Sequence, residues 1–350
     1  MTTKKLGRQT VALANPPTLA GHANVVGKKE GEGPLASSFD LIGSDDTFGE
    51  ATWEKSESAM QKQALALALD KAGQAASAMD WLFAGDLLNQ CIGATFGLRE
   101  MGIPFVGIYG ACSNMAEGLA LSALMVDGGA MKKTIAVTSS HFCTAERQYR
   151  FPLEYGGQRP LTAQWTVTGS GAAIVGERVS PPYIKAVTLG CIEDLGIKDA
   201  NNMGAAMAPA AAATIKRFFE DTCTVPDNYD LILTGDLGQV GSDLLHQLLE
   251  REGYHLGKKQ ADCGLLIYDR ETQDVHAGGS GCGCSASVLC SYILPAVKDG
   301  RIKNMLFVAT GALLSPTSVQ QGESIPGIAH LIHLSADDDT KTRPSTAGGM

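Results

Sequence analysis

The residue with the clearest chemical potential is Cys112, in the turn Gly110-Ala111-Cys112-Ser113-Asn114. The turn follows the apolar run Phe105–Tyr109 and opens a predicted helix, so it resembles the strand-to-helix turn that presents a nucleophile. Helix N-terminal amides and the helix dipole would lower the pKa of this thiol and stabilise an oxyanion or a bound carboxylate. Cys112 is therefore a candidate nucleophile, and the amides of Cys112 to Asn114 are candidate anion donors. A buried cysteine that fills a tight turn explains the pattern equally well.

A nucleophilic thiol needs an acid or base beside it, and His141 is the candidate. It follows the end of a predicted strand and heads a polar cluster. The cluster consists of His141, Cys143, Thr144, Glu146, Arg147 and Arg150. This cluster either faces a pocket, where Arg147 could anchor an anionic ligand, or forms a solvated loop with a Glu–Arg pair. The sequence favours neither interpretation.

Two aspartates occupy matching positions. Asp86 lies in Gly85-Asp86-Leu87 and Asp236 in Gly235-Asp236-Leu237, each directly after a predicted strand. Two carboxylates in one pocket could perform acid–base work or hold a cation. Capping of the helices that follow is the single role that the pattern favours most.

A glycine-rich loop, Gly278 to Ser285, precedes a second predicted helix and could bring the amides of Gly279 and Ser280 close to an anion. The loop lacks the Gly-Lys-Ser/Thr ending of a phosphate-binding P-loop. The nearby cysteines and His276 do not have the spacing of a zinc site. We therefore expect neither a metal nor a cofactor.

The composition narrows the class of protein. The chain has 350 residues, of which 44% are hydrophobic and only 6% aromatic, with 41 glycines. These values suit an α/β protein with a substantial core. A net charge of −9 makes nucleic acid and anionic lipid poor partners. Nine scattered cysteines, together with the lack of a recognisable signal peptide or spanning segment, predict a soluble protein in a reducing compartment.

Strands and helices alternate between a lead-in at 1–45, expected to be extended, and a tail at 336–350, expected to be mobile. In the first part we predict a helix over 52–72, strands over 81–84 and 105–109, a helix over 113–126 and a strand over 134–138. In the second part we predict a strand over 231–234, a helix over 285–297 and a strand over 305–309.

The order of these elements indicates an internal duplication. The Gly-Asp-Leu turns recur 150 positions apart, and Cys112 and Cys284 both lie at predicted helix starts. Asp127-Gly128 and Asp299-Gly300 end the two helices. We predict two halves, 1–180 and 181–335, although two ordinary βα units with common turn residues could give the same markers.

Several motifs resemble those of the thiolase superfamily. Gly110 to Ser113 is similar to the nucleophile turn of ketoacyl synthases, and 168–175 and 308–314 are similar to their glycine-rich segments. The resemblance implies a duplicated five-layered αβαβα fold with two mixed sheets. It also implies a homodimer formed through the first-half sheets.

Longer motifs are similar to the stage V sporulation protein AD family. They lie at 84–90, 138–150, 154–158, 203–210, 233–237 and 315–317. This resemblance implies binding of dipicolinic acid, a flat pyridine dicarboxylate. It further implies partnership with other stage V sporulation A membrane proteins and a place in the forespore, peripheral to the spore inner membrane.

The departures from active synthases matter. These enzymes hold a histidine in the second-half loop that here reads Gly235-Asp236-Leu237-Gly238, and an Asn or His in a later glycine turn. We therefore predict a binder of dipicolinate, free or as its calcium chelate, with Cys112 a vestigial nucleophile. The predicted ligand contacts are Cys112, Ser113, Asn114, Asp86, Asn89, His141, Arg147, Asp236, Gly279 and Ser280. The alternatives are an acyltransferase or thioesterase that uses Cys112, and a scaffold without a ligand.

Overall fold

The computed structural model describes residues 3–149 and 159–337. Arg150, the motif at 154–158 and all but the first two residues of the predicted tail lie outside these ranges. The strands are β1 (Lys4–Leu6), β2 (Thr10–Ala12), β3 (Thr18–Val26), β4 (Leu41–Ile42), β5 (Trp81–Gly85), β6 (Phe105–Gly107), β7 (Lys133–Ser140), β8 (Trp165–Thr166), β9 (Gly169–Gly176), β10 (Tyr183–Leu189), β11 (Leu231–Thr234), β12 (Gln260–Asp262), β13 (Gly279–Ser280), β14 (Asn304–Ala312) and β15 (Gly327–Ser335). The helices are α1 (Trp53–Lys71), α2 (Ile92–Leu98), α3 (Asn114–Asp127), α4 (Phe142–Tyr149), α5 (Met203–Thr222), α6 (Gly238–Arg251), α7 (Cys263–Leu266), α8 (Cys282–Val288), α9 (Leu294–Lys298) and α10 (Pro316–Gln320).

The strand order repeats, which confirms the predicted duplication. One set of strands runs β6-β5-β7-β9-β3 and the other runs β12-β11-β14-β15-β10. In each set the first three strands are parallel and the last two are antiparallel to their neighbours. The two sets meet where β10 pairs with β3 at a single position, Tyr183 with Thr18.

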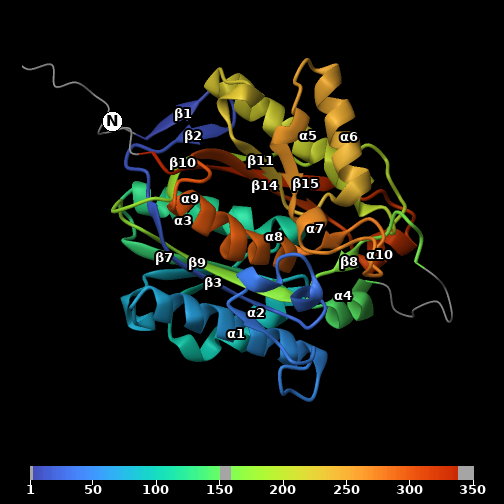
Figure 1. Cartoon of the computed structure of the whole chain (residues 1–350), viewed down its shortest axis with the longest axis horizontal. Coiled ribbons are helices and arrows are strands. Elements are labelled where there is room, and N and C mark those ends of the chain that lie inside the picture. The colour runs from blue at the N-terminus through green and yellow to red at the C-terminus, as the bar shows by residue number, and fades with distance from the viewer. Residues whose placement is uncertain (1–2, 150–158, 338–350) are drawn as a thin grey trace, which may run out of the picture.

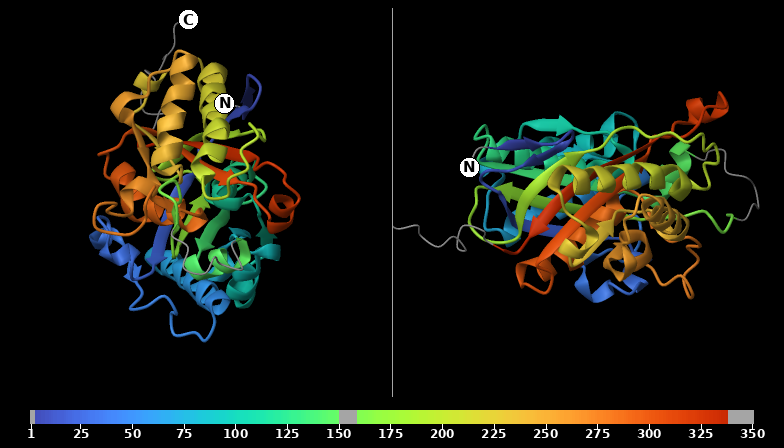
Figure 2. Two further views of the ribbon diagram at one scale, coloured as in Figure 1. Left: turned by 90° about the vertical axis from the view of Figure 1, so that its right-hand side faces the viewer. Right: turned by 90° about the horizontal axis from the view of Figure 1, so that it is seen from above.

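Helices and sheets form five layers (Figure 1). The outer faces carry α1 and α2 on one side and α5 and α6 on the other, and the left view of Figure 2 shows the same separation. Between the sheets lie α3, α8 and α9. Buried apolar residues fill the interfaces between the layers, so the core is divided among them. The predicted thiolase-like α/β fold is confirmed, with the refinement that hydrogen bonds link its two sheets at one edge.

The lead-in expected at 1–45 is not peripheral. It contains β3, which pairs with β9 over most of its length and is largely buried. Its apolar residues place β3 as the first strand of one unit, in the position that β10 holds in the other. The second-unit helix also begins earlier than predicted, at Cys282, and passes through a π-helical segment, Leu289–Ile293, before α9. Within the described ranges, no helix combines the length and the apolar character needed to cross a membrane.

Candidate functional site

Cys112 lies in a strained turn between β6 and α3. The preceding Ala111 has a φ of +52°, a left-handed conformation that is unfavourable for a residue with a side chain. Ala111–Ser113 form a 3-10 turn, and the Ser113 hydroxyl donates to Gly110 O at 2.7 Å. A close approach by β14 confines the turn, because a Cβ on Gly311 would lie 2.5 Å from Gly110 O. The predicted strand-to-helix turn at Cys112 is therefore confirmed.

The chemical state of the thiol differs from the sequence prediction. Burial, and next the charge of Asp236, raise the pKa of Cys112 well above its ordinary value. The carboxylate of Asp236 and the amide of Gly281 both lie close enough to the sulfur to act on its pKa. The expectation that the helix N-terminus would lower this pKa was wrong, because removal from water and a neighbouring anion both disfavour a thiolate. Cys112 is a neutral thiol at neutral pH.

Asp236 occupies the side of Cys112 where active synthases are expected to hold a histidine. It is fully buried. Its Oδ2 accepts from the Gly281 amide at 2.9 Å, and its Oδ1 accepts from the Thr310 hydroxyl at 2.9 Å. Burial raises the pKa of Asp236 to about 7, and these donors limit the shift. A carboxylate in this position cannot act as the positively charged or neutral nitrogen donor that polarises a substrate carbonyl.

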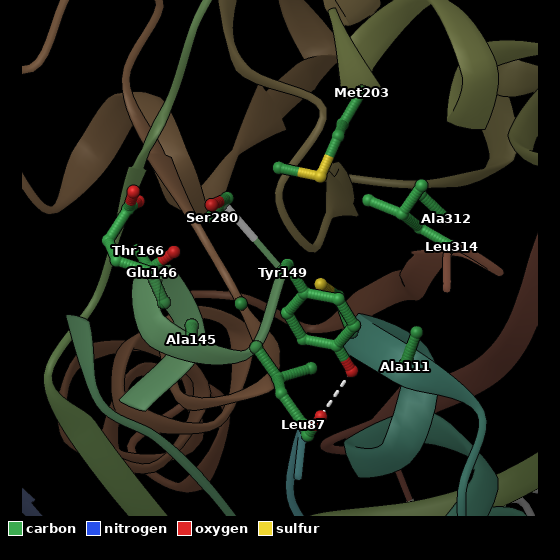
Figure 3. Close-up of a pocket in the computed structure, with 12 residues that line it drawn as sticks. Leu87, Ala111, Ala145, Glu146, Tyr149, Thr166, Met203, Ser280, Ala312 and Leu314 are labelled. Carbon is green, nitrogen blue, oxygen red and sulfur yellow. Dashed lines mark hydrogen bonds between the residues drawn. The ribbon is translucent and has the colours of Figure 1, made fainter. Parts of the chain in front are cut away.

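A cavity opens beside the thiol (Figure 3). It contains about 480 Å³ of space between atoms, water at its mouth included. Its walls come from both units, and they are Leu87, Ala111, Cys112, Ala145, Glu146, Tyr149, Thr166, Met203, Ser280, Gly281, Ala312 and Leu314. The Tyr149 ring crosses the cavity, and its hydroxyl donates to Leu87 O, while Met203 points in from α5. No lysine, arginine or histidine belongs to these described walls.

Of the predicted ligand contacts, the structure brings Cys112 and Ser280 to the cavity wall, with Asp236 directly behind Cys112. Gly279 lies one residue from the wall in β13, where its carbonyl accepts from Gln164. Backbone amides of this glycine-rich loop were expected to bind an anion. The amide of Gly281 is not available for this, because it is already bonded to Asp236.

Ser113 and Asn114 support the turn instead of facing the cavity. The Ser113 amide donates to Gly110 O, and the Asn114 amide donates to Ala111 O. The Asn114 side chain accepts from the Gly110 amide at 2.6 Å and donates to Asp86 O at 3.2 Å. The expectation that these two backbone amides would bind a carboxylate is therefore wrong, because the 3-10 turn occupies both.

Asp86 performs the capping role that the sequence favoured. Its carboxylate accepts from the amides of Leu88 and Ala94 at 2.8 and 2.7 Å, at the start of α2. It lies away from the cavity, next to the buried Glu57. Burial, and next the charge of Asp86, raise the pKa of Glu57, and burial raises the pKa of Asp86. The two matching aspartates therefore do not form a catalytic pair.

His141, Asn89 and Arg147 also lie outside the cavity wall. His141 Nε2 donates to Asp46 O at 2.7 Å and its Nδ1 accepts from the Cys143 amide, so both ring nitrogens are engaged. Burial lowers its pKa. Arg147 is an exposed partner of Glu54, and Asn89 accepts from Tyr109 on a separate surface depression. Neither interpretation of the cluster holds as a whole: it lies largely in helix α4 and not in a solvated loop, its Glu146 faces the cavity, and Arg147 pairs with Glu54 at the surface.

The sequence interpretation missed several wall residues. Ala145 and Tyr149 share one face of α4 with Glu146, which the sequence analysis had placed only in a cluster that could face a pocket; positions three and four apart are neighbours on a helix. Met203 comes from the first turn of α5, and Thr166 from β8, which pairs with β13. The helical spacing at 145–149 was a usable signal, whereas the approach of α5 depends on long-range packing. Among the described residues, no three His, Cys, Asp or Glu side chains gather as metal ligands would.

Known proteins share this architecture and, in one case, much of the sequence. The profile of the stage V sporulation protein AD family matches residues 7–335. Stage V sporulation protein AD of Bacillus subtilis (strain 168) is 47% identical over 327 residues, which cover 93% of this chain and 96% of that one. The 3-oxoacyl-[acyl-carrier-protein] synthase III of Aquifex aeolicus VF5 has 13% identity and a TM-score of 0.57, over 92% of this chain and 100% of that one. The corresponding enzyme of Pseudomonas aeruginosa PAO1 has 12% identity and a TM-score of 0.53, over 95% and 99%. The synthases share the fold, and the chain itself belongs to the stage V sporulation protein AD family.

Proposed function

We propose that the chain binds dipicolinic acid in the Cys112 cavity without converting it, and that this binding serves uptake of the acid into the developing spore. The observation that carries the non-enzymatic part is the buried thiol paired with Asp236. A nucleophilic mechanism needs a thiolate and an electrophilic donor, and this arrangement opposes the first and replaces the second with a carboxylate.

The cavity suits a flat ligand with polar ends. Leu87, Met203 and Leu314 offer apolar surface, and the hydroxyls of Thr166 and Ser280 offer hydrogen bonds. The described wall carries no basic side chain but does carry Glu146, and Asp236 lies behind Cys112. These charges would repel a bare dianion. We therefore propose that the acid enters as its calcium chelate. In this chelate the two positive charges of the calcium ion balance the two carboxylates of the acid.

Calorimetry of dipicolinate binding, with and without calcium, tests this proposal. We expect heat of binding with calcium and little without it. Ala312→Phe, which fills the cavity, should abolish binding, and its fold is checked by circular dichroism. Arg147→Ala is the matched control, because Arg147 lies outside the cavity wall, and it should bind as the unmodified protein does. No heat in either condition, or normal binding by the Ala312→Phe variant, would refute the proposal.

Residual acyl transfer is the second candidate, favoured by the left-handed Ala111 that presents Cys112 as in a nucleophile turn. It requires transfer of an acyl group from an acyl-CoA to Cys112, which mass spectrometry of the intact protein would detect as an adduct. A scaffold that binds only partners would instead show a melting temperature indifferent to dipicolinate and calcium.

We also propose that two copies pair through β6, and that the protein lies against the spore inner membrane beside other stage V sporulation A membrane proteins. The pairing is supported by the position of β6 at the edge of the sheet. Phe105, within β6, and Tyr109, just after it, are both exposed. Sedimentation measures the assembly directly. Phe105→Lys should shift it toward the monomer, and a monomeric unmodified protein would contradict this pairing.

A further inference from the structure

Two buried carboxylate oxygens lie near each other outside the cavity. Oε2 of Glu30 and Oδ1 of Asp46 are both inaccessible to water and have no hydrogen-bond partner. Both point at the same small volume, because a Cβ added to Gly27 would lie 2.7 Å from the first oxygen and 2.8 Å from the second. Glu30 as a whole is only 1% exposed. Buried acceptors without a donor are costly, so these two oxygens need a donor.

The groups around this pair are neutral except for Lys29, which interacts with the charge of Glu30 but donates its hydrogen bond to Asp274 O and not to either orphaned oxygen. The other oxygen of Glu30 accepts from the Tyr268 hydroxyl and from the Thr168 amide at 3.0 Å. His141 donates to the backbone carbonyl of Asp46, and burial lowers the pKa of its ring, which therefore stays neutral. Burial also raises the pKa values of Tyr268 and of Cys143, which faces Asp46 from α4, so both are neutral at pH 7. The ammonium of Lys29 lies over the Trp165 ring, 3.9 Å from its centroid.

We propose that Glu30 carries a proton that it donates to Asp46, and that this hydrogen bond holds segment 27–46 against Thr168 and the start of α4. The protonated carboxyl of Glu30 donates to Oδ1 of Asp46, which gives both orphaned oxygens a partner. Pairing of β3 with β4 and a bond from the Gly43 amide to Val26 O already join the two ends of this segment, and the contact adds a link between Glu30 and Asp46. The Gly27 amide bonds to Thr168 O at 2.8 Å, and Asp46 O holds His141 at 2.7 Å.

The hydrogen bond between Glu30 and Asp46, here called the clasp, is connected to the cavity. His141 immediately precedes α4, whose residues Ala145, Glu146 and Tyr149 form part of the cavity wall. Loss of this proton places the charge of the fully buried Glu30 beside that of the half-buried Asp46, and the segment relieves this repulsion by separating from His141. We infer that ligand binding weakens when the clasp opens; this coupling rests on the proposed function, whereas the clasp itself does not.

The sign and size of the pH dependence follow from linkage. Burial is the main cause that raises the pKa of Glu30 from 4.5 to about 7 in the closed state, with the charge of Asp46 adding to it. The closed state thus holds a proton that the open state releases. The equilibrium constant for opening of the segment should therefore rise by up to about tenfold per pH unit from roughly pH 4.5 to 7. It should level off above that range.

Hydrogen exchange of the whole chain without ligand measures this opening, read at the amides of Gly27 and Cys143 and expressed as protection factors. Glu30→Gln is the informative variant, because its amide nitrogen donates permanently to Asp46 while its oxygen keeps the bonds from Thr168 and Tyr268. We expect protection to fall with pH in the unmodified protein and to stay constant in this variant. Glu32→Gln, at an exposed position two residues away, should retain the slope of the unmodified protein.

Each outcome decides the proposal. An equal slope in the Glu30→Gln and unmodified proteins would overturn it, and a water would then satisfy both oxygens. Recovery of protection on adding calcium to the unmodified protein alone would assign the site to a cation instead. If Glu30→Gln does not fold, Asp46→Asn, whose amide donates to Glu30, must show the same constant protection.

Calorimetry with the calcium chelate at pH 6 and 8 tests the coupling between the clasp and ligand binding. We expect weaker binding at pH 8, and we expect Glu30→Gln to restore it. Absence of binding at both pH values refutes the proposed function and leaves the exchange result to decide the clasp.

Discussion

Asp236→Asn provides the most direct test of the paired thiol and carboxyl. The asparagine oxygen can accept from the Gly281 amide, as Oδ2 of Asp236 does at 2.9 Å, and its NH₂ can donate to Thr310 Oγ1 and Cys112 Sγ. The variant therefore reproduces the protonated aspartic acid at every pH. The unmodified chain must instead ionise a fully buried carboxyl as pH rises.

The expected size of the effect follows from the pKa of Asp236, which rises from 3.8 to about 7 on folding because of burial. A raised acid pKa contributes stability that is present below pH 4 and is lost as pH rises toward 7. Because one pKa unit corresponds to about 1.4 kcal/mol, linkage between pH 5.5 and pH 8 removes about 2 kcal/mol from the free energy of unfolding of the unmodified protein. Asp236→Asn should avoid this loss.

Urea unfolding at pH 5.5 and pH 8, followed by circular dichroism, measures the difference. We expect the free energy of unfolding of Asp236→Asn, relative to the unmodified protein, to be about 2 kcal/mol more favourable at pH 8 than at pH 5.5. Asp243→Asn, at an exposed position on α6, is the control and should show no such change. A difference between Asp236→Asn and the unmodified protein that is the same at both pH values would refute the reasoning.

Three other experiments probe the buried groups of the fold. Iodoacetamide at pH 8 should modify the exposed Cys191 well before the buried Cys112, and peptide mass spectrometry that finds Cys112 modified first would contradict a neutral thiol. Gly281→Ala should destabilise the fold by about 1–3 kcal/mol in urea unfolding, because its φ is +101° and the new Cβ would lie 2.5 Å from Ser140 Oγ; an unchanged midpoint would show that the loop adjusts freely. Phe218→Ala should cost about 3–5 kcal/mol in the same assay, since this residue of α5 has a fully buried ring, and a loss below 1 kcal/mol would mean that the core collapses into the space.

The sequence was sufficient for the parts of the fold that local pattern controls. Buried strands such as β5 and β11 are short apolar runs that end at a Gly-Asp turn, and both were predicted within one residue. The turn at Cys112 was also recognisable, because a strand, a glycine and a helix start follow one another within a few residues. The repeated order of such turns then indicated the duplication.

Features that depend on distant contacts were not accessible in this way. The strand β3 lies among glycine and lysine residues that suggest a loop, and its place is fixed by pairing with β9, about 150 positions away. The pKa of Cys112 depends on Asp236, which approaches from the other unit. Helix-terminal geometry is local and predicts a low pKa, whereas desolvation is set by the whole fold and prevails here.

The matching aspartates show how a duplicated motif acquires two roles. In the first unit Asp86 caps α2 through the amides of Leu88 and Ala94. In the second unit Asp262, at the end of β12, accepts from the amides of Leu237 and Gly238 at the start of α6. Because Asp262 already satisfies that helix start, Asp236 is free to turn toward Thr310, Gly281 and Cys112. The carboxyl that, together with burial, keeps the thiol neutral thus depends on a capping residue from a different strand. The chemistry of the cavity is therefore set by the packing of β12 against β11 as much as by the cysteine turn itself.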